Sequence, residues 1–261
     1  MKAAIIPNYD KCGILEILDS LKIKLDSLKI EYVIVSDDED LKNCDFIITI
    51  GGDGTIIHAA KTGAKYGKAI LGIHKGRLGY LADITPSELD LIAKIADNDF
   101  VIEERMLLSV SVGDESYYCL NDAVISKGSL SRMIDINVEI DGNLISYRAD
   151  GLIAATPTGS TAYSMSAGGP VVDPSLELFL LTPICSNSLF DRPILFNDDS
   201  VIRVSVKCPK NTEAFLTVDG EKSIKINSDD VITIKRADVF AKLMRVHNNS
   251  FYKTLFEKMR G

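Results

Sequence analysis

The chain has 261 residues, which is enough for one large domain or two smaller ones with a sizeable core. Its residues are 46% hydrophobic and 25% charged, the balance of an ordinary globular protein. The net charge of −8 argues against binding to nucleic acid or to an anionic membrane, but it is compatible with a local basic pocket for a nucleotide.

The cysteines and histidines indicate a reducing compartment and no zinc centre. Five cysteines are scattered with no C-x-x-C pair, a pattern that favours free thiols over disulfides. The three histidines lack the spacing of a zinc site.

No apolar run approaches the roughly 20 residues of a membrane span, and the amino-terminal apolar segment is too short for a signal peptide. The sequence therefore predicts a cytoplasmic protein.

The first hundred residues alternate between apolar runs and segments with helical periodicity. Strands are expected at residues 2–7, 31–36, 45–50 and 69–73, with helices at 13–28, from near Thr55, and from 85 to about 97. The last helix opens with the capping-box pattern Thr85-Pro-Ser-Glu88. Alternating strands and helices imply right-handed crossovers, so a doubly wound parallel sheet is predicted.

From residue 100 to about 236 the sequence has little helical periodicity and many short β-rich runs. Strands are expected at 107–112, 117–120, 123–126, 134–140, 144–147, 201–206, 215–218 and 231–234. Residues 249–260 regain helical character. We therefore predict an α/β domain at 1–98, a β-rich, sandwich-like domain at 99–236, and a segment at 237–261 that returns to the first domain. A cleft between the domains is the expected site.

A glycine-rich turn ends the predicted strand at 45–50. It reads Gly51-Gly-Asp-Gly-Thr55 and opens a helix. Glycines let a ligand approach bare backbone amides, and a helix amino terminus favours phosphate. Asp53 is out of place in a simple phosphate cradle, so it indicates a metal ion or a hydroxyl to be oriented or deprotonated. Ordinary strand-to-helix turn chemistry is the alternative.

Two further stretches carry candidate ligand groups. Residues 72–81 hold three glycines with Lys75 and Arg77, which indicates a second phosphate-approaching loop or an exposed loop with solvated charges. Residues 150–170 concentrate hydroxyls and small residues, and Ser160 or Thr161 is expected to cap a short helix carrying Tyr163. This stretch suits adenine and ribose, or a helix packed at a domain junction.

Together these motifs resemble the NAD kinase family. The resemblance rests on Gly51-Gly-Asp-Gly-Thr55 and Thr156-Pro-Thr-Gly-Ser-Thr-Ala-Tyr163, with the 71–81 loop, Asn121-Asp122 and Val218-Asp-Gly220 in the same order. The first motif is shared with lipid kinases, whereas the second is more specific to NAD kinases. The resemblance implies Mg²⁺-dependent transfer of a phosphoryl group from ATP, or from polyphosphate in some members, to the 2′-hydroxyl of the adenosine ribose of NAD. It also implies a homodimer or homotetramer.

The resemblance also implies roles for individual residues. Asp53 resembles the carboxylate that activates the 2′-hydroxyl. The donor-phosphate loops correspond to Gly51, Gly52, Thr55, Lys75, Gly76 and Arg77. The NAD contacts correspond to Gly54, Asn121, Asp122, Asp150, Thr161, Ala162, Tyr163 and Ser166. No residue is assigned as a dedicated metal ligand.

Three positions depart from the family pattern: Asp122 replaces a usual Glu, His74 a usual Asn, and Ser186-Asn187 a frequent Pro-His. Two other functions share parts of the pattern. A lipid kinase would use the same glycine loop but needs a broad apolar entrance or a basic membrane-facing patch. A nucleotide sensor would bind NAD or NADP without transfer, and the retained Asp53 favours an enzyme over it.

Overall fold

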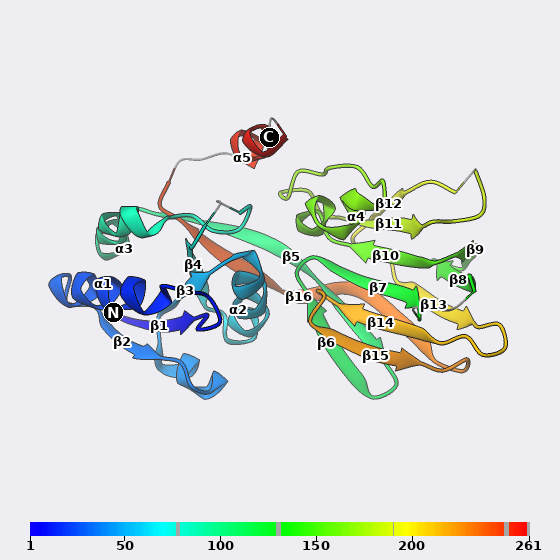
Figure 1. Ribbon diagram of the computed structural model, residues 1–261, viewed down its shortest axis with the longest axis horizontal. Coiled ribbons are helices and arrows are strands. Elements are labelled where there is room, and N and C mark those ends of the chain that lie inside the picture. The colour runs from blue at the N-terminus through cyan, green and yellow to red at the C-terminus, as the bar shows by residue number, and fades with distance from the viewer. Residues whose placement is uncertain (77–78, 129–131, 190, 248–250, 260–261) are drawn as a thin grey trace. The chain divides into compact units, whose positions relative to one another are not determined.

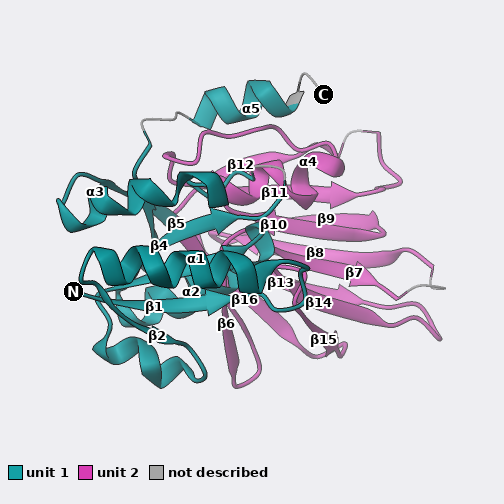
Figure 2. Cartoon of the chain, turned by 60° about the vertical axis from the view of Figure 1, so that its left-hand side comes forward, with its two compact units in different colours: residues 1–105, 239–261 teal, residues 106–238 magenta. Residues whose placement is uncertain are grey.

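The computed structural model describes residues 1–76, 79–128, 132–189, 191–247 and 251–259. The chain forms two compact units: unit 1 comprises residues 1–105 and 239–261, and unit 2 comprises residues 106–238 (Figure 2). Unit 1 is built on a parallel sheet and unit 2 on antiparallel sheets, as predicted. The segment boundaries drawn from the sequence at residues 98 and 236 stay a prediction.

The strands of unit 1 form a parallel sheet in the order β2-β1-β3-β4 (Figure 1). The strands are β1 (Lys2–Pro7), β2 (Glu31–Ile34), β3 (Phe46–Gly51) and β4 (Ala69–His74). Every residue of β3 is buried, which explains its continuous apolar run. The last part of β16 (Val231–Arg245) pairs in parallel with β4, so the C-terminal segment returns to the first domain.

Helices cover both faces of this sheet. The helix α1 (Ile14–Ser27) buries a stripe of five apolar residues against Ile48 and Ile50 of β3. The helix α2 (Asp53–Tyr66) lies on the opposite face, where Gly63 is close to Ile47 and Ile70. Successive strand residues point to opposite faces, so the doubly wound prediction is confirmed.

The predicted helix at 85–97 is divided. A 3-10 helix, η2 (Pro86–Ile92), precedes the single turn α3 (Ala93–Ala96). The capping box is present, because the Glu88 carboxylate accepts the Thr85 backbone N–H at 2.8 Å. Glu88 itself has non-helical dihedrals, which interrupts the regular helix after its first turn. The remaining helical elements of unit 1 are η1 (Asp38–Asn43) and α5 (Phe251–Met259), and residues 249, 250 and 260 of the predicted terminal helix lie outside the described part of the chain.

Unit 2 contains two antiparallel layers that share one apolar core. One sheet has the order β12-β11-β10-β7-β14-β15, and β8, β9, β13 and the first part of β16 form the other, while β5 pairs with β16 and β6. These strands are β5 (Val101–Val112), β6 (Glu115–Cys119), β7 (Asp122–Lys127), β8 (Ile134–Ile140), β9 (Asn143–Ala149), β10 (Gly151–Ala155), β11 (Leu178–Ile184), β12 (Ile194–Asn197), β13 (Ile202–Lys207), β14 (Ala214–Val218) and β15 (Lys222–Ile226). This arrangement is the predicted sandwich-like fold.

Four strands of unit 2 were not predicted: β10, β11, β12 and β15. The strand β10 falls in the stretch 150–170 of hydroxyls and small residues, and it lies inside the sheet between β7 and β11. All five of its residues are buried, so its sequence shows no alternation between polar and apolar residues. The short helix after it is α4 (Tyr163–Ser166), preceded by η3 (Thr158–Thr161).

The predicted cap of α4 is wrong. Its N-cap is Ala162, and no side chain caps it. The Ser160 hydroxyl instead accepts the Val172 N–H at 3.0 Å and lies 3.3 Å from the Val172 carbonyl oxygen. That hydroxyl is fully buried and is used to fasten the following loop.

Candidate functional site

The glycine turn lies between β3 and α2 in unit 1. The strand ends at Gly51, the helix begins at Asp53, and Gly52 is the extended N-cap between them. The helix therefore starts two residues before the predicted Thr55. Gly51 pairs with His74 at the end of β4, so the turn lies at the carboxyl edge of the parallel sheet, the usual ligand side of such sheets.

The carboxylate of Asp53 is held by the second glycine loop. The Tyr80 N–H donates to Oδ2 at 3.0 Å and the Leu81 N–H donates to Oδ1 at 3.4 Å. A Cβ added at Gly79 would overlap the Asp53 carboxylate, so only glycine permits this approach. The structure thus brings the two glycine loops together through Asp53.

Two lysine ammoniums lie near helix amino termini in unit 1, one beside the first glycine turn and one at the start of α1. The ammonium of Lys11 lies 2.5 Å from the position of a Cβ at Gly52, and the ammonium of Lys75 lies against Gly13. Within the described ranges, neither ammonium has an ion-pair or hydrogen-bond partner. Unpaired cations near a helix amino terminus favour an anion. Of the other predicted loop residues, Gly76 is described with φ of 110°, whereas Arg77 lies outside the described residues.

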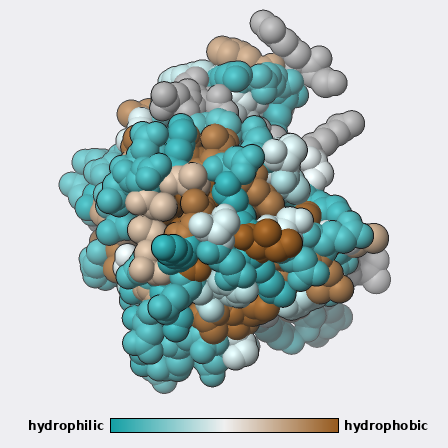
Figure 3. All heavy atoms as spheres, turned by 90° about the vertical axis from the view of Figure 1, so that its left-hand side faces the viewer, coloured by the Kyte–Doolittle hydropathy of each residue, from teal (hydrophilic) through white to brown (hydrophobic). Residues whose placement is uncertain are grey.

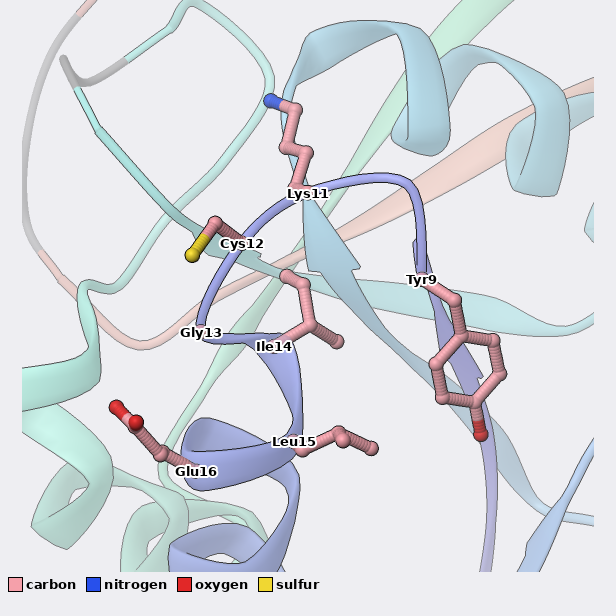
Figure 4. A pocket seen from close by; sticks show the side chains of 7 residues that line it. All are labelled: Tyr9, Lys11, Cys12, Gly13, Ile14, Leu15 and Glu16. Atoms are coloured by element: carbon pink, nitrogen blue, oxygen red, sulfur yellow. The ribbon is translucent and has the colours of Figure 1, made fainter.

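Lys11 was not predicted from the sequence. It belongs to the loop after β1, and it lines a pocket of about 430 Å³ together with Tyr9 and residues 12–16. Figure 4 shows its side chain extending away from Tyr9 and Leu15. A lysine in the loop after a strand parallel to β3 is the available signal, because loops at the carboxyl ends of parallel strands share one edge of the sheet.

Two other polar side chains complete this part of unit 1. The Thr55 hydroxyl accepts a hydrogen bond from the Asn8 amide at 3.1 Å, which ties the glycine turn to the loop after β1. His74 is only 7% exposed, and its Nδ1 has no hydrogen-bond partner among the described residues. Burial lowers the pKa of His74 despite the nearby Asp53 carboxylate, so the imidazole is neutral at physiological pH.

Unit 2 contains a pocket of about 400 Å³ beside β7 and α4. Four predicted site residues line it: Asn121, Asp122, Ala162 and Tyr163. It is completed by Val124, Ser126, Thr217, Asp219 and Gly220. The small residue at 162 and the half-exposed ring at 163 leave room for a flat ligand, while the amide and carboxyl groups supply hydrogen bonds.

Asp122 is buried in this pocket beside a second carboxylate. Burial, and next the negative charge of Asp219, raise the pKa of Asp122 to about 7, although the Tyr163 backbone amide opposes the shift. At neutral pH the Asp122 carboxyl is therefore present in both charged and protonated forms. It is able to donate or accept a hydrogen bond at a ligand hydroxyl.

Asp219 holds the turn that contains the predicted site residues Asn121 and Asp122. Its carboxylate accepts the backbone N–H groups of Leu120, Asn121 and Asp122 at 2.9, 2.8 and 3.1 Å. The sequence showed only an Asp-Gly turn pair there, without its long-range partners. On the other side, Gly159 lies so close to the Asn121 backbone that a Cβ would overlap it.

The structure does not gather the remaining predicted contacts into this pocket. Thr161 and Ser166 belong to η3 and α4 but do not line it. Asp150 precedes β10 and forms an ion pair with Lys127 at 2.8 Å. Asp122 pairs with Ala155 at the far end of β10, so Asp150 lies roughly 17 Å along the strand at about 3.3 Å per residue.

Known proteins share both halves of this arrangement. The model of the ATP-NAD kinase N-terminal domain matches residues 26–99, and that of the C-terminal domain matches residues 120–246. An NAD kinase of Carboxydothermus hydrogenoformans is 42% identical over 230 residues, and the match covers 85% of this chain and 82% of that relative. An NAD kinase of Caldicellulosiruptor saccharolyticus is 36% identical over 263 residues and is covered completely, as is this chain.

Solved structures agree with the sequence matches. The crystal structure of an NAD kinase from Archaeoglobus fulgidus in complex with ATP superposes with a TM-score of 0.82 at 30% identity, covering 100% of this chain and 99% of the other. A yeast NADH kinase complexed with NADH shows the same fold, with a TM-score of 0.87 at 22% identity. The superposition covers 99% of this chain and 87% of the yeast chain. On these matches, and with Asp53 in its glycine turn, the chain belongs to the NAD kinase family.

Proposed function

We propose that this NAD kinase transfers the terminal phosphoryl group of ATP to the 2′-hydroxyl of the adenosine ribose of NAD, with Asp53 as the catalytic residue. The main support for this role is that the backbone N–H groups of Tyr80 and Leu81 donate hydrogen bonds to the Asp53 carboxylate. A carboxylate fixed at the carboxyl edge of the sheet is suited to orient a hydroxyl and accept its proton.

The donor phosphates are assigned to the loops of unit 1. The proposed residues are Gly51, Gly52, Thr55, Lys75, Gly76 and Arg77, to which we add Lys11. The support is the amino terminus of α2 with the Lys11 ammonium beside it, and the Lys75 ammonium at the start of α1, neither of which has a partner among the described residues. Phosphoryl transfer has a loose transition state, so it depends on positioning and charge neutralisation more than on covalent chemistry.

Mg²⁺ belongs to the proposal as a companion of the donor phosphates. Across the described residues, no cluster of three or more His, Cys, Asp or Glu side chains is arranged to hold a metal. Mg²⁺ commonly keeps its waters and binds through one or two carboxylates plus substrate phosphates. Asp53 is the carboxylate available in the glycine turn, so the residues present suit that mode. When bound, the ion would neutralise phosphate charge.

NAD recognition is assigned mainly to unit 2. The proposed contacts are Gly54, Asn121, Asp122, Asp150, Thr161, Ala162, Tyr163 and Ser166. The pocket beside Tyr163 suits the adenosine, and Asp122 suits its ribose hydroxyls. The separation of Asp150 from Asp122 along β10 is compatible with opposite ends of an extended dinucleotide.

The first test measures NADP formation from NAD with ATP and Mg²⁺, in wild type and Asp53→Asn. We expect kcat to fall about 100-fold or more, as for loss of a general base, with little change in the KM for NAD. The exposed variant Asp90→Asn, which removes only an ion pair with Lys24, is the matched control. Equal losses in kcat and NAD affinity would contradict the catalytic role of Asp53.

The same assay separates the alternatives. Replacing ATP with tripolyphosphate tests the donor class, because the phosphate loops serve both donors but only ATP carries a nucleoside. A wild-type chain that binds NADP without forming it from any donor would be a sensor. On the face shown in Figure 3, hydrophobic residues gather near the middle among hydrophilic ones. The net charge of −8 gives no support to the basic membrane-facing patch of a lipid kinase.

The proposal extends to location and assembly. No helix within the described ranges is long and apolar enough to cross a membrane. A cytoplasmic location is supported by the five cysteines, all of which are free thiols. We propose a homodimer or homotetramer, which light scattering of the purified chain would test.

A further inference from the structure

Arg245 makes an unusual set of contacts with the second glycine loop. It lies at the end of β16 with only 15% of its side chain exposed. Its Nη1 donates to the carbonyl oxygens of Leu81 at 2.9 Å and Ala82 at 3.3 Å, and its Nη2 donates to the carbonyl oxygen of Tyr80 at 3.5 Å. One guanidinium thus holds three consecutive backbone carbonyls of the loop.

The opposite side of this backbone holds Asp53. The Tyr80 carbonyl and the Leu81 N–H belong to the same planar peptide group. Its oxygen accepts from Arg245, and its N–H donates to the Asp53 carboxylate. Rotation of this peptide would therefore break contacts on both sides. The position of the Arg245 guanidinium is coupled to that of the Asp53 carboxylate through one rigid group.

Acidic side chains fix Arg245 in turn. Its Nε donates to Glu103 Oε2 at 2.6 Å, and its Nη1 lies 3.7 Å from Asp83 Oδ1. Burial by itself raises the pKa of Glu103, but the positive charges of Arg105 and Arg245 outweigh burial, and the net pKa is lowered. Glu103 is therefore ionised at neutral pH. Asp83, only 4% exposed at its side chain, also accepts the N–H groups of Val246 and His247 at 2.7 and 3.1 Å.

We propose that Arg245 is a positioning residue for phosphoryl transfer, which aims Asp53 by fixing the Tyr80–Leu81 peptide. This inference rests on the proposed catalytic role of Asp53. Arginine is required because its planar fork presents several donors at fixed angles, whereas lysine presents one compact ammonium. A purely structural role, in which Arg245 only fastens the end of β16, would affect stability without a selective effect on kcat.

The test compares Arg245→Lys with wild type in steady-state kinetics. Since a displacement of about 1 Å at a reacting group costs up to about 100-fold in rate, we expect kcat to fall at least about 10-fold, with the KM values for NAD and ATP changed less than about twofold. Arg236→Lys is the matched control: it is the same exchange on the same strand, and Arg236 pairs with Glu177 and Asp198. Unchanged kcat in Arg245→Lys would overturn the inference.

A double-mutant cycle separates positioning from general destabilisation. If Arg245 acts through Asp53, the loss caused by Arg245→Lys should largely disappear in the Asp53→Asn background, measured at high enzyme concentration. A loss of the same factor in both backgrounds would show an independent effect and overturn the inference. Glu103→Gln, which weakens the hold on Nε but leaves Arg245 present, should give a smaller loss of the same kind.

Hydrogen exchange provides a readout independent of turnover. The Tyr80 and Leu81 amides should exchange faster in Arg245→Lys than in wild type, and the Arg236→Lys control should leave them unchanged. Unaltered exchange in Arg245→Lys would contradict the coupling itself. If wild type does not make NADP, the proposed function fails, and with it the catalytic role of the coupling between Arg245 and Asp53. If wild type is active and Arg245→Lys has the same kcat, only this inference is overturned.

Discussion

At the scale of single residues, Asp122 shows how burial changes the chemistry of a side chain. An exposed aspartate is ionised at neutral pH, but Asp122 is 5% exposed and faces Asp219. Its pKa rises from 3.8 to about 7 in the folded chain, mainly because burial disfavours the charged form. The folded state therefore binds a proton that the unfolded state releases between these two values.

The predicted consequence is a loss of stability as pH rises. The contribution of protonated Asp122 to the unfolding free energy is fully present below pH 3.8, falls as pH rises through about 7, and is constant above that. Asp122→Asn removes this titration, so the difference in unfolding free energy between variant and wild type should grow in favour of the variant from pH 4 to 7. Denaturant unfolding at several pH values measures it. A pH-independent difference would contradict the raised pKa.

At the scale of elements, the close approach of the second glycine loop to α2 depends on Gly79. Any side chain there would collide with the Asp53 carboxylate, which has little freedom because two amides hold it. The loop must then move away from α2, or the carboxylate must turn. Both responses displace Asp53 from its proposed catalytic position.

We therefore expect Gly79→Ala to lower kcat by about 100-fold while the chain stays folded, because about 1 Å of displacement at a reacting group is sufficient for such a loss. Steady-state kinetics measure the loss, and circular dichroism checks the fold. Gly113→Ala, in a turn of unit 2 where a Cβ meets nothing within 4 Å, is a control for added methyl groups, although its φ of 56° gives it some strain. Full activity in Gly79→Ala would show that the Asp53 carboxylate tolerates another position.

At the scale of the whole molecule, the two units differ in how they use the chain. Unit 2 is one continuous interval, 106–238, with its own core. Unit 1 needs the distant segment 239–261, which supplies Met244 and Val246 to its core and pairs with β4. Without that segment, β4 becomes an edge strand with unpaired backbone groups.

We predict that a fragment of residues 106–238 folds alone, whereas a fragment of residues 1–105 folds only when residues 239–261 are joined to it by a flexible linker. NMR chemical-shift dispersion and cooperative thermal unfolding measure both outcomes. The control is the fragment of residues 1–105 that carries the linker but lacks residues 239–261. A fragment of residues 1–105 that unfolds as cooperatively and at the same temperature with or without the segment would refute the prediction.

The sequence by itself determined the local elements and the main motifs. The strands at 2–7 and 69–73 and the helix at 13–28 were predictable because continuous apolar runs and helical stripes report burial directly. The glycine turn around Asp53 was equally visible, because its backbone and helix-terminus chemistry depend on neighbouring residues. Family membership followed from the order of such motifs.

Tertiary structure alone decided the contacts between residues distant in sequence. The strand β10 has no polar alternation, because neighbours bury both of its faces. The raised pKa of Asp122 comes first from its burial in the folded chain and next from the charge of Asp219, which is 97 residues away. The coupling of Arg245 to Asp53 passes through a loop more than 160 residues before Arg245. No local pattern encodes these contacts, because the folding of the whole chain brings the partners together.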